Sequence, residues 1–141
     1  MALDLYAHPF SSFCQKALIA LYEAETPFAL KMLDAEHPDN FAALKAAWPL
    51  GRFPALKDGE RWVMEATCII EHLDVFHPGA ERMIPEDRNL ALEVRFLDRV
   101  FDNDVSGQQQ ALIYNALRPE SRVTPTVKPG RARRWRWPTP G

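Results

Sequence analysis

The segment that decides the fold covers residues 5–21 and reads LYAHPFSSFCQKALIAL. Its first residues belong to a short apolar run, residues 3–6, which predicts a β-strand. Residues 13–24 then favour a helix, because small and apolar side chains recur at helical spacing in Ala17, Leu21 and Ala24. A strand that leads directly into an amphipathic helix is how a βαβ unit begins, so this segment predicts an α/β domain.

Strands and helices continue to alternate up to about residue 73. The expected elements are a strand, a short helix, two strands and a helix, over residues 26–33, 39–47, 53–56, 61–64 and 67–73. The short helix ends before Pro49, and Asp58-Gly59 between the last two strands is the strongest hairpin signal of the chain. The predicted order is βαβαββα, in which a βαβ unit is followed by an antiparallel hairpin.

A long amphipathic helix is expected after a turn at residues 77–79. Pro85 and two acidic residues open it, since the helix dipole favours negative charge at a helix N-terminus. Its apolar stripe consists of Leu90, Val94, Leu97 and Phe101. Such a stripe needs a partner surface, which other helices of the chain or a second subunit would supply.

The last part of the chain differs in composition from the rest. Residues 1–117 contain ten Lys and Arg against eighteen Asp and Glu, a net charge of −8, whereas residues 118–141 contain seven Lys and Arg against Glu120, a net charge of +6. This tail is rich in proline and has neither helical nor strand periodicity, so it is expected to be disordered. A frameshift or a truncated gene product would explain so abrupt a change.

Composition argues against several classes of protein. No basic segment with a following apolar run stands at the N-terminus, and no stretch approaches about 18 apolar residues, so neither a signal peptide nor a membrane span is expected. Cys14 and Cys68 are too few for a disulfide framework, which favours reduced thiols and a cytoplasmic protein. His8, His72 and His77 have no acidic or cysteine partner at metal spacing, and no metal is expected.

Three motifs together carry a family resemblance: LYAHPFSSFCQKALIAL, WPLGRFPAL at residues 48–56 and MEATCIIEHLD at residues 64–74. In this order and at these separations they resemble the first-strand, third-strand and third-helix motifs of the cytosolic glutathione S-transferases. The similarity extends from Ala2 to about Leu117, and the first motif is most similar to serine-type, bacterial-like members. It implies a homodimer through the long helix.

The resemblance, together with the composition of the tail, predicts four parts of the chain. These are a thioredoxin-like glutathione-binding domain, a linker, a truncated all-helical C-terminal domain and a disordered basic tail, over residues 1–77, 78–86, 87–117 and 118–141. Members of the family continue into further helices, which form one wall of the pocket for the electrophilic substrate.

Serines at the start of the first helix are the candidates for catalysis. A free thiol has a pKa of about 8.5 to 9, and lowering it by about two units requires roughly 2.7 kcal/mol of preferential thiolate stabilisation. A hydroxyl donor at a helix N-terminus, with the backbone amides and dipole there, lowers a thiol pKa. Ser12-x-x-Gln15 has the form of a capping box, which assigns Ser12 to the helix cap and leaves Ser11 free to face the site. The resemblance also implies Ser11 as the catalytic donor, with Ser12 as the alternative.

Two other residues of this motif have competing interpretations. Tyr6 lies near the position at which tyrosine-type members place their donor, but it is better explained as an aromatic residue of the strand. Ser11-x-x-Cys14 is similar to a CxxC redox motif whose attacking cysteine is replaced, and disulfide exchange needs that missing low-pKa thiol. We therefore interpret Cys14 and Cys68 as core residues of their helices.

The other two motifs imply contacts with glutathione. Arg52-Phe53-Pro54 resembles the segment in which a cis proline presents backbone groups to the cysteinyl part of glutathione, and an edge-strand proline is the alternative. Glu65 matches the acidic residue that holds the γ-glutamyl ammonium at a helix N-terminus, where amides bind the carboxylate; a plain acidic residue at a helix start is the alternative. Ala66 stands where the family pattern has serine, so one hydroxyl contact with glutathione is lost unless Thr67 substitutes for it.

Other candidates are weaker. His37 and Lys31 lie near the loop where a basic residue often approaches the glycyl carboxylate, but surface residues are the simpler interpretation. Residues 134–137, Arg-Trp-Arg-Trp, have the composition of a nucleic-acid or membrane patch, but they are short and isolated, so neither partner is expected.

Two functions remain open at this point. In the first, Ser11 stabilises the glutathione thiolate, which attacks an electrophilic small molecule. In the second, the chain is a relic that binds glutathione or only folds, because the pocket for the electrophile is missing. The sequence does not identify the electrophile.

Overall fold

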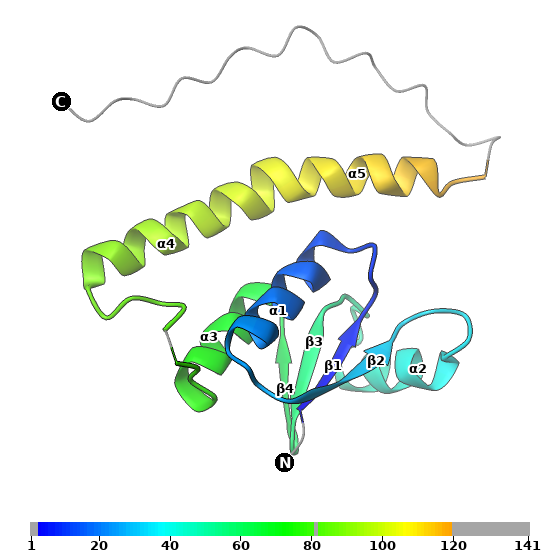
Figure 1. The fold of residues 1–141 in the computed structure, drawn as a ribbon. Coiled ribbons are helices and arrows are strands. Elements are labelled where there is room, and N and C mark those ends of the chain that lie inside the picture. Colours follow the sequence, from blue (N-terminus) through cyan, green and yellow to red (C-terminus); the bar gives the residue numbers. More distant parts are fainter. Residues whose placement is uncertain (1–2, 81, 120–141) are drawn as a thin grey trace, which may run out of the picture.

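The computed structural model describes residues 3–80 and 82–119. These residues form a four-stranded sheet with helices on both faces, and one long helix lies across two of those helices (Figure 1). In chain order the elements are β1 Leu3–Ala7, α1 Ser12–Glu23, β2 Phe28–Met32, α2 Pro38–Ala47, β3 Ala55–Asp58, β4 Arg61–Met64, α3 Ala66–Phe76, α4 Arg88–Val100, η1 Phe101–Ser106 and α5 Gly107–Ala116. The thioredoxin-like order βαβαββα and the long helix after it are therefore confirmed. The predicted disordered tail lies outside the described residues from residue 120 onward.

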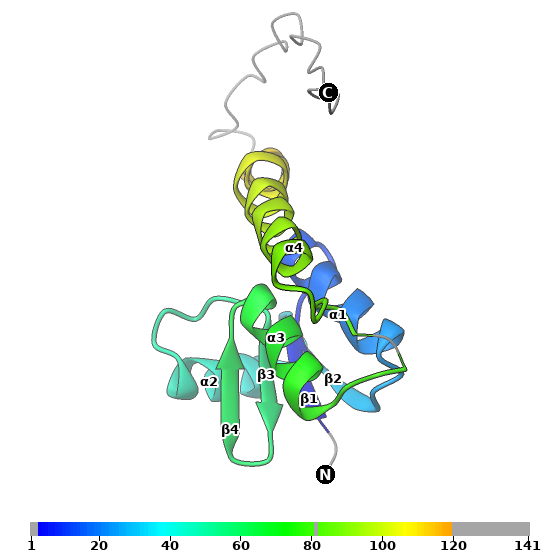
Figure 2. The same ribbon diagram turned by 90° about the vertical axis from the view of Figure 1, so that its left-hand side faces the viewer.

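The sheet has the strand order β2-β1-β3-β4. β1 is parallel to β2 and antiparallel to β3, so Leu5 pairs with Leu30 on one side and with Leu56 on the other. β3 and β4 form the predicted hairpin, and its turn contains Gly59 at φ +60°, a conformation that favours glycine (Figure 2). The strand predicted to start at residue 53 starts at Ala55.

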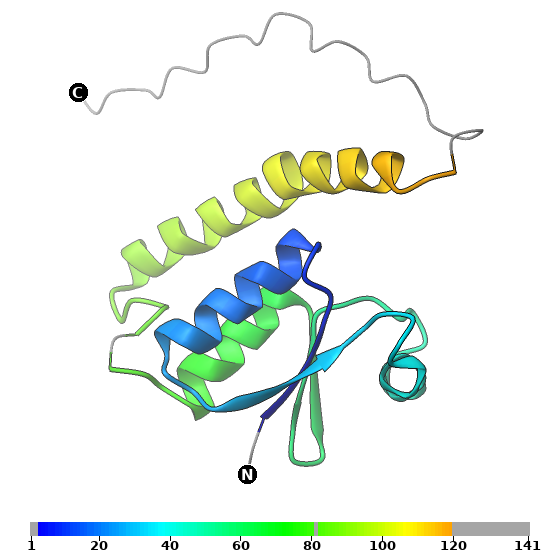
Figure 3. The same cartoon turned by 45° about the vertical axis from the view of Figure 1, so that its right-hand side comes forward.

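The side chains of β1 alternate between two apolar layers, as a strand buried on both faces requires. One layer packs against α1 and α3, which lie side by side (Figure 3), and contains Leu3, Leu5, Ala7, Cys14, Ala17, Ala20, Leu21, Leu56, Ile69 and Leu73. The other layer packs against α2 and contains Tyr6, Leu33, Leu44 and Ala55. Tyr6 is 6% exposed and its ring lies 4.8 Å from that of Trp62, so its interpretation as a strand aromatic is confirmed.

The two cysteines differ in burial. Cys14 is fully buried in the first layer, as expected. Cys68 is exposed, so its assignment to the core is wrong. The reason is helical periodicity: the buried apolar residues of α3 are Ala66, Ile69 and Leu73, and Cys68 lies on another face of the helix.

The loop after α3 is held in place before the long helix begins. Gly79 passes so close to α1 that an added Cβ would lie 2.8 Å from the Cα of Ala24. The buried Asp74 carboxylate accepts hydrogen bonds from the backbone N–H groups of Met83 at 3.1 Å and Ile84 at 3.3 Å. Its other oxygen lies 2.7 Å from the Arg82 guanidinium.

The long helix consists of α4, the π-helical turn η1 and α5 without a break (Figure 1). It starts at Arg88, three residues after Pro85, because Asp87 caps it by accepting from the backbone N–H groups of Asn89 at 2.9 Å and Leu90 at 3.0 Å. Within the described chain, no helix is long and apolar enough to cross a membrane.

The apolar stripe predicted for this helix is largely uncovered in the part of the chain that the structure describes. Leu90, Leu97 and Phe101 are 52%, 38% and 56% exposed, and the only buried residue of α4 is Ala91. The helix instead meets α1 and α3 through polar side chains.

Candidate functional site

The cap of α1 is Ser11. Its backbone is extended, at φ −91° and ψ 120°, and its Oγ accepts a hydrogen bond of 3.4 Å from the backbone N–H of Cys14. The prediction that Ser12 caps this helix is wrong: Ser12 is the first helical residue, and its hydroxyl donates to Gln110 Oε1 at 3.5 Å. Two adjacent serines both suit a cap, and the Ser11 N–H bond to the carbonyl oxygen of His8, at 3.1 Å, places Ser11 in that position.

The cap leaves the Ser11 hydroxyl able to act as a donor. A hydroxyl can accept and donate at the same time, and no hydrogen bond donated by Ser11 Oγ is present within the described residues. The residue is 5% exposed and stands where the unpaired N–H groups and the dipole of α1 favour negative charge. The nearby Cys14 is unlike a reactive thiol, because burial raises its pKa and outweighs hydrogen bonds from His8 and Ser11.

A cavity of about 370 Å³ lies beside Ser11. Four predicted site residues line it, Ser11, Arg52, Phe53 and Glu65, and they come from the start of α1, the loop before β3 and the start of α3. Four residues that were not predicted from the sequence also line the cavity, namely Phe13, Gly51, Gln110 and Tyr114.

The peptide bond between Phe53 and Pro54 is cis, as the resemblance implied. Pro54 is fully buried and does not line the cavity. The alternative of an edge-strand proline is wrong, because Pro54 immediately precedes β3, which lies between β1 and β4.

Glu65 stands at the N-cap of α3 in an unusual backbone conformation, with φ 71° and ψ 134°. Positive φ is costly for a residue with a Cβ, and such strain concentrates at functional sites. Its side chain does not cap the helix, and the described residues form no hydrogen bond or ion pair with its carboxylate. The carboxylate thus remains available at the cavity, directly before the first N–H groups of α3.

The next two residues are not brought to this cavity. Ala66 is buried. The Thr67 hydroxyl donates to Asp98 Oδ2 at 2.8 Å and accepts from Lys16 Nζ at 3.0 Å, so it is used in contacts with α1 and the long helix. The structure therefore gives no support to the prediction that Thr67 replaces the missing serine hydroxyl.

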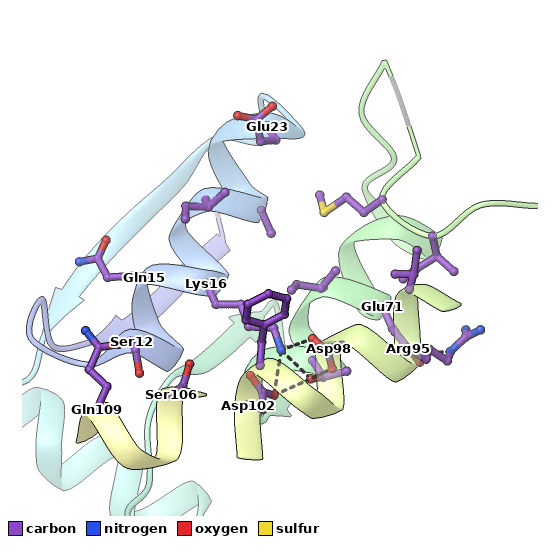
Figure 4. A pocket seen from close by; sticks show the side chains of 18 residues that line it. Ser12, Gln15, Lys16, Glu23, Glu71, Arg95, Asp98, Asp102, Ser106 and Gln109 are labelled. Carbon is purple, nitrogen blue, oxygen red and sulfur yellow. Dashed lines mark hydrogen bonds and ion pairs between the residues drawn. The ribbon is translucent and has the colours of Figure 1, made fainter. Parts of the chain in front are cut away.

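A second, larger cavity of about 780 Å³ lies between α1, α3 and the long helix (Figure 4). Its wall is mostly apolar, and at one end Lys16 makes ion pairs with Asp98 and with Asp102, the latter at 2.9 Å. Burial alone would raise the pKa of Asp98, but hydrogen bonds from Lys16, Arg99 and Thr67 outweigh it and hold the pKa below its usual value. The long helix is anchored by this polar cluster.

The remaining candidates lie elsewhere. His37 Nδ1 is 2.6 Å from Asp34 Oδ1, and Lys31 Nζ is 3.6 Å from Asp4 Oδ1; neither residue lines the cavity beside Ser11. The statement that His72 and His77 lack an acidic partner is wrong. Both contact Asp58, which the hairpin brings next to the end of α3, a proximity that sequence spacing does not reveal.

Comparison with known proteins identifies the family of this chain. Residues 5–81 match the model of the glutathione S-transferase N-terminal domain. The chain is 30% identical over 77 residues to the chloroplastic glutathione S-transferase DHAR3 of Arabidopsis thaliana, covering 54% of this chain and 29% of that protein. It is 29% identical over 91 residues to glutathione S-transferase theta-3 of Mus musculus, covering 62% and 36%.

Solved structures agree with this similarity. A glutathione transferase family member from Pseudomonas fluorescens Pf-5, solved with bound glutathione, superimposes with a TM-score of 0.68 at 27% identity, covering 87% of this chain and 61% of that one. Poplar glutathione transferase F1 has the same fold, with a TM-score of 0.72 at 20% identity, covering 88% and 59%. The chain thus spans about a third of the length of the sequence relatives named above. It belongs to the glutathione S-transferase family.

Proposed function

We propose that the cavity beside Ser11 binds glutathione and that Ser11 activates the bound thiol for attack on an electrophilic small molecule. The observation that carries this proposal is the meeting of Ser11, Arg52, Phe53 and Glu65 around one cavity. The glutathione bound in the structure of the Pseudomonas fluorescens relative supports it.

The charges around the cavity match those of glutathione, which has one ammonium group and two carboxylates. The Glu65 carboxylate, which has no partner within the described residues, suits the ammonium group. The N-terminus of α3, a helix of 11 residues, suits the neighbouring carboxylate, and the Arg52 guanidinium suits a second one.

Ser11 suits the thiol because it combines a free O–H donor with a helix N-terminus. A hydrogen bond to a charged group contributes about 1.5–3 kcal/mol, which corresponds to a thiol pKa lower by about one to two units. In the reaction, the thiolate sulfur forms a bond to an electrophilic carbon. The displaced group leaves with the bonding electron pair, or, in an addition, that carbon's neighbour takes up a proton.

The competing function is binding of glutathione without activation of its thiol. The chain spans only part of the length of its relatives. Use of an electrophilic substrate and formation of a homodimer are therefore parts of this proposal.

The experiment measures glutathione binding and thiol ionisation separately. Binding is followed by calorimetry and by the rise in melting temperature with millimolar glutathione, because a ligand that binds only the folded state stabilises it. The ionisation of the bound thiol is followed by the ultraviolet absorbance of the thiolate as the pH is raised. Ser11→Ala is expected to retain binding but to raise the pKa of the bound thiol by about one to two units.

Two controls separate this effect from others. Ser11→Ala also removes a helix cap, which costs about 0.5–2 kcal/mol of stability. Asp87→Ala removes the cap of α4 instead and should lower stability without changing the thiol pKa. Ser12→Ala tests the alternative donor. Binding with an unshifted thiol pKa in the wild type would favour the competing function, and an absence of glutathione binding would refute the proposal.

A further inference from the structure

Three side chains of the types that commonly bind metals meet near the C-terminal end of α3. Asp58 Oδ2 lies 2.9 Å from His72 Nε2 and 2.8 Å from His77 Nε2, and the three ligand atoms lie within 4.8 Å of one another. Glu65 stands at the other end of this helix, whose 11 residues span about 16 Å at 1.5 Å per residue. The cluster is therefore separate from the cavity beside Ser11.

The backbone explains why these side chains meet. In a continuous helix, residues five positions apart point about 140° away from each other. His77 does not follow this helical geometry because it is the C-cap of α3, with a non-helical backbone at φ −137° and ψ 54°. Its N–H still bonds to the Leu73 carbonyl oxygen. Asp58 is the last residue of β3, and Figure 2 shows the hairpin turn beside the end of α3.

Within the described residues, the Asp58 carboxylate forms ion pairs only with the two imidazoles. Arg61 pairs with Asp58 in the strand ladder, but its guanidinium lies over the Phe76 ring, 4.8 Å from its centre. No ion pair joins Arg61 to Asp58 within the described residues. The His72 side chain is 6% exposed and that of Asp58 is 22% exposed, so the cluster is partly shielded from water while His77, at 28%, leaves a path to it.

We propose that Asp58, His72 and His77 bind a divalent metal ion of the Zn²⁺ class. Imidazole nitrogens and a carboxylate oxygen are typical zinc ligands, and three protein ligands leave a fourth position for water. With metal–ligand bonds of about 2.0–2.2 Å, neighbouring ligands of a tetrahedral site lie about 3.3–3.6 Å apart. The two contacts to Asp58 would each lengthen by about half an ångström on binding, which side-chain rotation allows.

Such an ion would join the β3–β4 hairpin to the end of α3. Each imidazole would bind through its Nε2 lone pair, so the Nε2 atom carries no proton in the bound state and binding weakens in acid. Because the ligands meet only in the folded chain, the ion stabilises the fold. This site would act on stability and would not take part in the thiol chemistry at the other end of α3.

The test uses the untagged 141-residue chain carrying Cys68→Ser, which removes the one exposed thiol of the described residues as a competing ligand. After treatment with a chelator, the protein is titrated with Zn²⁺ in a calorimeter and melted with and without Zn²⁺. We expect saturable binding of one ion per chain and a higher melting temperature. Co²⁺ in place of Zn²⁺ should give the visible absorption of a four-coordinate site.

Variants of the ligands decide the assignment. His77→Ala and Asp58→Asn are each expected to weaken Zn²⁺ binding by about 100-fold or more, since even groups that only support a ligand contribute about 10–100-fold. His37→Ala is the matched control, because it removes a histidine that also contacts one aspartate but has no second histidine beside it. Two ligand variants are used so that the test still stands if one of them fails to fold. Circular dichroism checks that each variant is folded. Absence of saturable Zn²⁺ binding, or equal affinity in both ligand variants and the wild type, would overturn the proposal.

Discussion

Lys16 Nζ on α1 lies 2.9 Å from Asp102 Oδ2, a residue of the π-helical turn 86 positions later in the chain. The two side chains are 21% and 13% exposed, so they are partly shielded from water. Thr67 on α3 donates to Asp98 one turn earlier in the long helix. Since the apolar stripe of that helix is largely uncovered, polar contacts connect it to the domain, and this cluster joins it to both α1 and α3.

We predict that Lys16→Met loosens the long helix. The substitution removes the Lys16 ammonium group and leaves Arg99 as the remaining cation beside Asp98 and Asp102. Breaking partly buried charged hydrogen bonds costs about 1.5–3 kcal/mol. Hydrogen exchange should become faster in residues 88–116 than in the sheet. Urea unfolding measures the total loss of stability, and a double-mutant cycle with Asp102→Asn isolates the pair.

The control for this prediction is Lys31→Met. Lys31 pairs with Asp4 at 3.6 Å, and both side chains are more exposed, at 37% and 30%. Removing an exposed pair costs about 0–1 kcal/mol. Equal effects of the two substitutions would mean that the Lys16 cluster does not anchor the long helix.

Local sequence patterns were sufficient to predict the strands and helices of the domain. Contacts between residues far apart in the sequence could not be predicted from such patterns. Asp58-Gly59 predicted the hairpin because a turn is encoded by its own residues. The partner of Thr67 could not be predicted, because it depends on how the long helix crosses α3. Tyr114 was missed at the cavity beside Ser11 for the same reason.

The cap of α1 shows a different kind of limit. Ser11 and Ser12 are chemically identical and adjacent, and the motif Ser-x-x-Gln favoured the second. In the structure Ser11 is the cap, and its backbone N–H bonds to the carbonyl oxygen of His8. Glu65 was predicted at the site, but its positive φ has no signal in the sequence.

Asp74 should make stability depend on pH in the acidic range. Burial alone would raise its pKa, but hydrogen bonds from Arg82 and from the backbone of Ile84 and Met83 outweigh burial, so the pKa lies below its usual value of 3.8. A carboxyl with a lowered folded pKa contributes stability that is complete above the unfolded pKa and is lost as the pH falls through the folded one.

We therefore predict that Asp74→Asn destabilises the protein at pH 6 and that its difference from the wild type shrinks as the pH falls from about 5 to about 3. Urea unfolding at several pH values measures this difference. The Asn side chain preserves size and one acceptor oxygen, so it isolates the charge. A difference that stays constant or grows in acid would contradict the assignment of the lowered pKa to the folded state.

The two thiols should differ in reactivity. Cys68 is exposed, whereas Cys14 is fully buried and its pKa is raised by burial. A chromogenic disulfide reagent at pH 7.5 should react rapidly with one thiol of the native protein and with two in denaturant. Cys68→Ser should abolish the fast phase, and Cys14→Ser should leave it intact. A fast phase that survives Cys68→Ser would mean that α1 opens readily in the native state.

Glu65→Gly should separate stability from glutathione binding. A side chain at φ 71° costs about 1–3 kcal/mol, and glycine removes that cost but loses about 0.5–1 kcal/mol in chain entropy, so the stability of the free protein should rise by about 1 kcal/mol. Glutathione affinity should fall by about tenfold or more, because the partner of its ammonium group is removed. Urea unfolding and calorimetry measure the two effects.

Glu25→Gly is the matched control, since Glu25 is the other described non-glycine residue with positive φ, at 50°, and it lies at the opposite end of α1 from Ser11. It should raise stability in the same way and leave glutathione affinity unchanged. If Glu65→Gly stabilises the protein and still binds glutathione as tightly as the wild type, the strained backbone at Glu65 does not contribute to glutathione binding. The ammonium group would then have to be held by another residue of the cavity.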